Sequence, residues 1–189
     1  MFMIRFLGDS EIREARGADP VVDEPLLPAG ALREGLAAGL LAAGAVALWF
    51  LITDTLAGAP LATPRHLGTL VARPLGLTSI AASPAASIVF YSLIHFGAFA
   101  LLGLATVICI VLAQREPHVL AGALIAFVIA EMVFYFVLAA LGVTTSTGPL
   151  TLGQVAVGNL IGIGILGAAL WRWHPELGPE FHRALADRD

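Results

Sequence analysis

The sequence predicts an all-α membrane protein, a bundle of four transmembrane helices with a short interfacial helix between the first two. Composition is the first observation behind this prediction, because 58% of the residues are hydrophobic and only 13% are charged, whereas a soluble domain carries about a quarter. The second is the run from Ala85 to Ala113, which contains no Asp, Glu, Lys or Arg. A helix rises ~1.5 Å per residue, so this run can cross a hydrocarbon core of about 30 Å.

Polar segments set the limits of the predicted bundle. Residues 1–30 mix charges and prolines without a helical period, which indicates a flexible tail or a docking segment that a partner orders. Residues 174–189 form a shorter polar tail. The apolar stretch from Met1 to Leu7 is too short for a cleavable signal peptide, and an acidic segment follows it. We therefore expect a transmembrane domain over 31–173.

The first predicted span covers residues 31–56. Gly35 and Gly39 lie one helical turn apart in it, and a face of small residues lets another backbone approach closely. Trp49 suits the interfacial position that aromatic residues favour near the end of a span. Asp54 falls in the last turn, where we expect it close to water and its charge to cost little.

The connection over 58–83 is too polar and too rich in proline to cross the membrane. Thr63-Pro64 is typical of a helix start, and the residues after it alternate between apolar and basic in a helical period. We expect a short helix over 64–72 that lies on the membrane surface. Its apolar side would hold Leu67, Leu70 and Val71, and its polar side Arg65, His66 and Arg73.

Further apolar runs predict three more spans. Ser83 before Pro84 is typical of an N-cap followed by proline in the first turn. The connection 114–118 is so short that it forces its two helices into an antiparallel hairpin. In the last span, Gly158 and Gly162 repeat the small-residue step of the first. The predicted ranges are 85–113, 119–142 and 151–173.

The distribution of arginine predicts the orientation. With four spans, the two tails and the connection 114–118 lie on one side of the membrane, and only Arg65 and Arg73 lie on the other. Because cytoplasmic segments carry the excess of basic residues, both termini are expected in the cytoplasm of a bacterium, and the protein in its inner membrane. The arginines of the cytoplasmic side are Arg5, Arg13, Arg16, Arg33, Arg115, Arg172, Arg183 and Arg188.

Three polar side chains, those of His95, Glu131 and Asn159, fall at a similar depth, roughly 10–15 Å below the outer surface, with Asp54 nearer water. An unpaired carboxylate at mid-membrane costs at least ~2.5–3.5 kcal/mol, so a hydrogen bond between His95 and Glu131 would satisfy both groups. Our first interpretation is that the four side chains make polar contacts that hold the helices together and stabilise the bundle by ~0.5–2 kcal/mol. The alternative is a metal, proton-relay or small-ligand site, since imidazole and carboxylate are common metal ligands.

Cofactor signals are sparse in the sequence. No HxxxH or ExxH spacing accompanies His95 and Glu131, so the first expectation is bound lipid and no cofactor, with metal at these two residues as the alternative. A haem would need axial ligands, for which His118 and His174 at the cytoplasmic ends of spans are the candidates. The single cysteine, Cys109, is interpreted as a small apolar filler.

Three short blocks carry a resemblance to a known group of proteins. They are the run from Ile94 to Phe99 (IHFGAF), the pair Gly158-Asn159, and the run from Trp171 to Pro175 (WRWHP). These blocks resemble blocks of uncharacterised bacterial four-span integral membrane proteins. The resemblance covers the spans and not the tails, and it implies the fold and a bacterial source but no activity.

The expected function follows from how little of the chain lies outside the membrane. Short connections leave almost no extramembrane domain for chemistry, and the small-residue faces suit lateral packing against lipids and other membrane subunits. We expect a non-catalytic accessory subunit of a larger inner-membrane complex, of the energy-converting (respiratory or photosynthetic) kind, and no nucleic-acid partner. The alternatives are a small redox protein that binds haem or metal through His95 and Glu131, and a minimal oligomeric transporter or channel.

Overall fold

The structure is a computed structural model, and it describes residues 30–116, 118–140 and 151–173. Every regular element in these residues is a helix, which confirms the predicted all-helical class. The two predicted tails, and the connection after the third predicted span, lie outside the described residues. The helices are α2 (Ala31–Leu56), α3 (Ala62–Ala72), α4 (Thr78–Ala82), α5 (Pro84–Arg115), α6 (His118–Ala140) and α7 (Leu152–Trp173).

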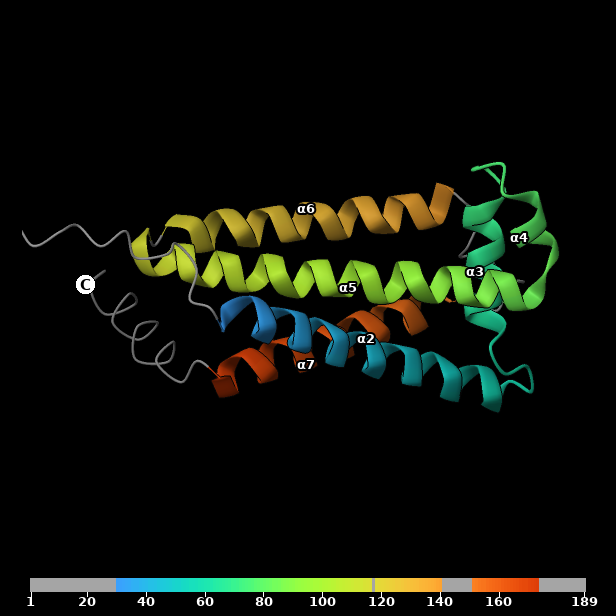
Figure 1. The fold of residues 1–189 in the computed structure, drawn as a ribbon, viewed down its shortest axis with the longest axis horizontal. Coiled ribbons are helices and arrows are strands. Elements are labelled where there is room, and N and C mark those ends of the chain that lie inside the picture. The colour runs from blue at the N-terminus through green and yellow to red at the C-terminus, as the bar shows by residue number, and fades with distance from the viewer. Residues whose placement is uncertain (1–29, 117, 141–150, 174–189) are drawn as a thin grey trace, which may run out of the picture.

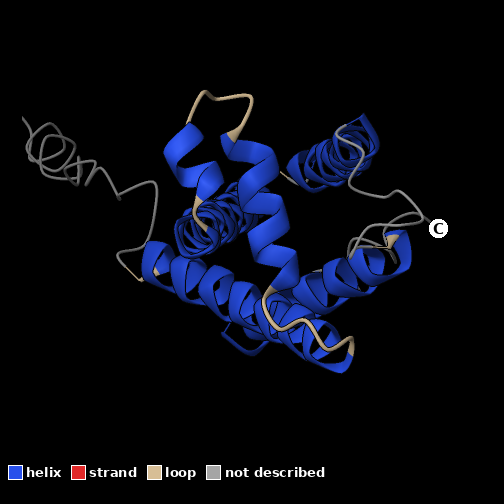
Figure 2. Cartoon of the chain, turned by 90° about the vertical axis from the view of Figure 1, so that its right-hand side faces the viewer, coloured by secondary structure: helices blue, strands red, loops and turns tan. Residues whose placement is uncertain are grey.

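The long helices α2, α5, α6 and α7 run along the long axis of the molecule (Figure 1). The start of α2, the end of α5, the start of α6 and the end of α7 lie at one end of this axis, so chain direction alternates from one long helix to the next. The helices α3 and α4 lie at the opposite end, and α3 crosses that end transversely (Figure 2). The short helix expected between the first two spans is therefore present, and it covers one end of the long helices.

Three helices are long and apolar enough to cross a membrane: α2, the section Pro84–Ala113 of α5, and α7. This is the pattern of a multi-pass membrane protein. The helix α6 has 23 residues. The apolar part of it that the structure describes without a gap, Gly122–Val137, is shorter than a full span. A fourth crossing by α6 therefore stays a prediction.

The helices α2 and α5 are in backbone contact along what we call the glycine seam, made by Gly35, Gly39 and Gly103. A Cβ atom added to Gly35 would lie 2.8 Å from the carbonyl oxygen of Gly103. One added to Gly39 would overlap the carbonyl of Phe99, and one added to Gly103 would overlap the carbonyl of Gly35. Small residues allow such close approach, which maximises van der Waals contact where no hydrophobic effect drives helices together.

The contact between α7 and its neighbours uses glycine differently. A Cβ added to Gly158 would lie 3.2 Å from Cε2 of Phe50, and one added to Gly162 would lie 3.1 Å from Cε1 of Phe99. Here the glycines make room for aromatic rings of α2 and α5 rather than for another backbone. The indole N–H of Trp49 also donates to the carbonyl oxygen of Gln154, 3.1 Å away, so one end of α7 is tied to α2.

Side-chain caps define the starts of α5 and α7. The hydroxyl of Ser83 accepts from the N–H of Ala86 at 3.3 Å, with Pro84 in the first turn, which confirms the predicted start of α5. At α7, the Thr151 hydroxyl accepts from the N–H of Gln154 while the Gln154 side chain accepts from the N–H of Thr151. This reciprocal pair is a capping box and satisfies two backbone donors that a helix start leaves unpaired.

The transverse helix α3 packs closely on the start of α5. A Cβ added to Gly68 would overlap the carbonyl of Ser87, and the hydroxyls of Thr69 and Ser87 lie 3.2 Å apart. Leu67 and Leu70 pack against Val155 of α7. The basic side chains Arg65 and Arg73 are exposed and His66 is half-buried. The apolar side of α3 thus faces the ends of the long helices.

Candidate functional site

The imidazole of His95 connects α5 to α2. Its Nε2 lies 3.1 Å from the carbonyl oxygen of Ala43, and because a carbonyl only accepts, this nitrogen donates the proton. The ring is surrounded by aromatic side chains, with ring centroids 5.8 Å away at Tyr91, 5.6 Å at Phe96 and 4.9 Å at Phe99. His95 is therefore half-buried in an aromatic cluster and oriented by a backbone group.

The expected hydrogen bond between His95 and Glu131 does not form. Instead, Oε2 of Glu131 accepts from Nδ2 of Asn159 at 2.9 Å, and the same amide lies 3.3 Å from the hydroxyl of Tyr135. The reason is helix arrangement: His95 points from α5 toward α2, whereas Glu131 on α6 points toward α7. The structure thus brings together two of the predicted polar residues, Glu131 and Asn159, and gives His95 a separate partner.

Asp54 is buried rather than close to water, with a relative exposure of 4%. Its carboxylate accepts the backbone N–H of Thr63 at 2.8 Å and the Thr63 hydroxyl at 2.7 Å. Thr63 lies in the first turn of α3, where backbone N–H groups lack helical partners and negative charge is favourable. The expected placement of Asp54 near the other polar residues is corrected accordingly: it anchors α3 to the end of α2.

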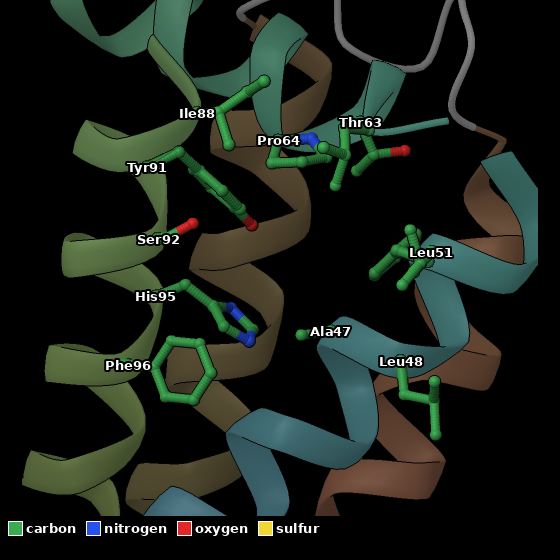
Figure 3. Close-up of a pocket in the computed structure, with 12 residues that line it drawn as sticks. Ala47, Leu48, Leu51, Thr63, Pro64, Ile88, Tyr91, Ser92, His95 and Phe96 are labelled. Carbon is green, nitrogen blue, oxygen red and sulfur yellow. The ribbon is translucent and has the colours of Figure 1, made fainter. Parts of the chain in front are cut away.

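Two pockets flank Tyr91 and His95. The larger, which we call the α2–α5 pocket, has a volume of about 300 Å³ and lies between α2, the start of α3, and α5 (Figure 3). The second, of about 210 Å³, lies on the other side of the two rings, and Phe134 of α6 and Asn159 of α7 contribute to its lining. The walls of both pockets are mainly aliphatic and aromatic.

The two metal-ligand candidates, His95 and Glu131, are held by different partners. Within the described residues, no group of three His, Cys, Asp or Glu side chains lies close enough together to hold a metal ion. His95 and Glu131 belong to different hydrogen-bonded sets, so they do not form one ligand set. The haem candidates are not tested, because the His118 side chain and all of His174 lie outside what the structure describes.

Several residues that build the site escaped the sequence reasoning. Gly103 completes the glycine seam, but a lone glycine in an apolar run carries no spacing signal. The sequence indicates Thr63 only as part of a helix start, and the contact with Asp54, nine residues earlier, is visible only in three dimensions. The capping box of α7 did have a signal, the Thr-x-x-Gln spacing of Thr151 and Gln154.

Comparison of the chain with protein-family models, with curated proteins and with solved structures returned no match. The function is therefore argued from the contacts of this chain alone.

Proposed function

We propose that this protein is a non-catalytic accessory subunit of a larger assembly in a bacterial inner membrane. The observation that carries the proposal is the contrast within α6: one stripe of half-buried side chains, which includes Glu131 in contact with α7, and exposed apolar side chains on the other faces of the helix. Relative exposure is 64% at Leu124, 69% at Met132 and 73% at Phe136. Such a surface needs lipid or another membrane protein against it.

The polar side chains of the long helices support a structural role. His95 donates to a backbone carbonyl of α2, Asp54 caps α3, and Glu131 accepts from Asn159. Each of these groups already holds two helices together, which is the use expected of interhelical polar contacts.

The topology proposed for this subunit has α6 as a fourth crossing and both termini in the cytoplasm. The arginine distribution supports it. The start of α2 and the end of α7, which carry Arg33 and Arg172, lie at the end of the molecule opposite α3, which carries Arg65 and is followed by Arg73 (Figure 1). The test is labelling of single cysteines introduced at Glu116 and Ala59 in a cysteine-free chain. A membrane-impermeant maleimide should label the Ala59→Cys variant in intact cells and the Glu116→Cys variant only after lysis. The reverse pattern, or equal labelling, would contradict this topology.

The accessory role is tested by photo-crosslinking in the native membrane. A diazirine amino acid placed at Phe136 of α6 should crosslink to a fixed, larger membrane protein, and the chain should co-purify with that protein in mild detergent. Leu101 of α5 is the matched control, since its exposure of 68% is close to the 73% of Phe136. Crosslinks to lipid alone from both sites would contradict the proposal, and ion or solute flux through the isolated chain in liposomes would favour the transporter alternative.

A further inference from the structure

The α2–α5 pocket exists because the glycine seam stops part of the way along the helices. The antiparallel pair meets in one-turn steps: Gly35 contacts Gly103, and one turn on Gly39 contacts the Phe99 carbonyl. At the next step, the His95 imidazole stands between the backbones and reaches the Ala43 carbonyl. The following positions of both helices line the pocket. His95 therefore marks the point where close contact ends, and α2 and α5 diverge beyond it (Figure 1).

Three polar atoms on one face of α5 are directed into this pocket. Figure 3 shows the Tyr91 hydroxyl, the Ser92 hydroxyl and the His95 ring on the side of α5 that faces α2. Neither hydroxyl hydrogen-bonds to another residue within the described parts of the chain. The Nε2 of His95 donates to Ala43, so in the neutral ring Nδ1 carries a lone pair and can only accept.

Most of the remaining lining is apolar. Leu48, Leu51 and Phe96 are exposed at its edge, which gives it a side opening between the helices. Thr63 lines the pocket at the end formed by α3, and it donates to both oxygens of the Asp54 carboxylate. Leu61 lines the pocket at the same end and has a φ of 64°. Leucine rarely adopts this left-handed conformation, which tends to occur at functional sites.

We propose that the α2–α5 pocket binds a membrane-soluble molecule with a phenolic head group. A phenol O–H can donate to Nδ1 of His95, and its oxygen can accept from the hydroxyl of Tyr91, so a single amphoteric group pairs both of these groups. A carbonyl or ether would leave Nδ1 without a donor. The volume of about 300 Å³ lies at the lower end of small-molecule pockets and suits one aromatic ring with a short chain.

The aromatic and aliphatic walls favour a flat ring with an alkyl tail. Tyr91, His95 and Phe96 present their rings to the cluster, and the exposed leucines at the edge offer a path for a tail into lipid. This binding function is separate from the accessory role, because the docking surface proposed for that role is α6 and no residue of α6 lines this pocket.

The experiment is equilibrium dialysis of three matched probes against the full chain in nanodiscs of phosphatidylcholine and phosphatidylglycerol. The probes are 4-hexylphenol, 4-hexylanisole, whose ether cannot donate, and hexylbenzene, which has no polar atom; discs without protein correct for partition into lipid. Saturable binding of 4-hexylphenol is expected, with 4-hexylanisole and hexylbenzene about tenfold weaker or more.

The matched variants are Tyr91→Phe and Tyr135→Phe, which remove the hydroxyl of a pocket tyrosine and of the tyrosine beside Asn159. Tyr91→Phe should weaken 4-hexylphenol about tenfold and leave hexylbenzene unchanged, whereas Tyr135→Phe should change neither. A Leu51→Trp variant, which fills the pocket with a ring, should abolish saturable binding. The proposal is overturned if the wild-type chain shows no binding above empty discs, if the three probes bind equally, or if both tyrosine variants behave alike.

Discussion

The contacts of α2 with α5 and of α6 with α7 are built on opposite principles. The first is the glycine seam, where Gly35, Gly39 and Gly103 bring two backbones together without a charged group. The second depends on polar side chains, since the Asn159 amide reaches the Glu131 carboxylate and the Tyr135 hydroxyl. Along α6 no described side chain is buried, whereas α2 buries a continuous face of small residues.

The two kinds of contact leave different surfaces free for other partners. Contact between backbones is set by shape, and at the glycine seam it leaves no room for an added atom. A polar attachment holds a helix at one level and leaves its remaining surface available. Of the long helices, α6 has no buried side chain among its described residues, so it is the helix best placed to pack against another protein.

The largest expected effect comes from adding one carbon to the seam. The Gly39→Ala change places a Cβ against the Phe99 carbonyl, and because the obstacle is backbone, the helices must separate at a cost of about 3 kcal/mol. The measurement is the free energy of unfolding in mixed micelles. Gly44→Ala, on the same helix, is the control: its Cβ would meet no described atom within 4 Å, so no loss is expected. Equal losses at the two positions would mean that the seam is not close-packed.

A second effect tests a polar anchor that is buried, unlike the one on α6. Replacing Asp54 by Ala leaves the Thr63 N–H without its acceptor, and we expect a loss of about 2 kcal/mol. The change should also release the start of α3, detected as faster proteolysis in the turn over 57–61. Thr63→Val keeps the N–H bond to the carboxylate and should lose about half as much. An Asp54→Ala chain as stable and as protease-resistant as wild type would show that α3 is held by its apolar side alone.

Removing the polar attachment of α6 should have a smaller and more local effect. The Asn159→Leu change deletes the amide that reaches Glu131 and Tyr135, at a cost of about 1 kcal/mol. Hydrogen exchange should rise in α6 and stay unchanged in α2 and α5. Leu160→Ala, at the neighbouring exposed position, controls for a general change in α7. A rise that extends through α2 would contradict the division between the two regions.

The smallest expected effect is the coupling free energy between His95 and Glu131, which should be near zero. His95 and Glu131 have no shared partner, so the losses caused by His95→Ala and Glu131→Ala should add to within about 0.5 kcal/mol in a double-mutant cycle. A direct hydrogen bond between the two would give a coupling of about 0.5–1.5 kcal/mol. A double variant with no loss of stability at all would remove the structural role proposed for both residues.

The sequence predicts the helices well because their signal is local. Uncharged runs, Ser83 before Pro84, and the prolines of the connection act over a few residues, and the all-helical class follows from them. The small-residue steps in α2 also indicate which face can approach another backbone. The choice of partner helix is not local, and Gly103 shows it: only the fold reveals that this glycine faces Gly35.

The site was less predictable, because the depth of a residue in the membrane does not determine which neighbouring helix its side chain faces. His95, Glu131 and Asn159 were grouped because they share a level, but a helix presents residues of one level to any neighbour according to its rotation. The rotation of α5 about its axis turns His95 toward α2 rather than α6, and depth carries no information on that rotation. Depth did place Glu131 beside Asn159, and the terminal position of Asp54 concealed that α3 folds over it.

The lining of the α2–α5 pocket has a consequence for biosynthesis. All of it comes from residues 47–96, which precede α6 and α7 in the chain. Chains emerge from the ribosome N-terminus first. Every residue that lines this cavity is therefore synthesised before α6 and α7, and neither of the last two helices has to supply a side chain to it.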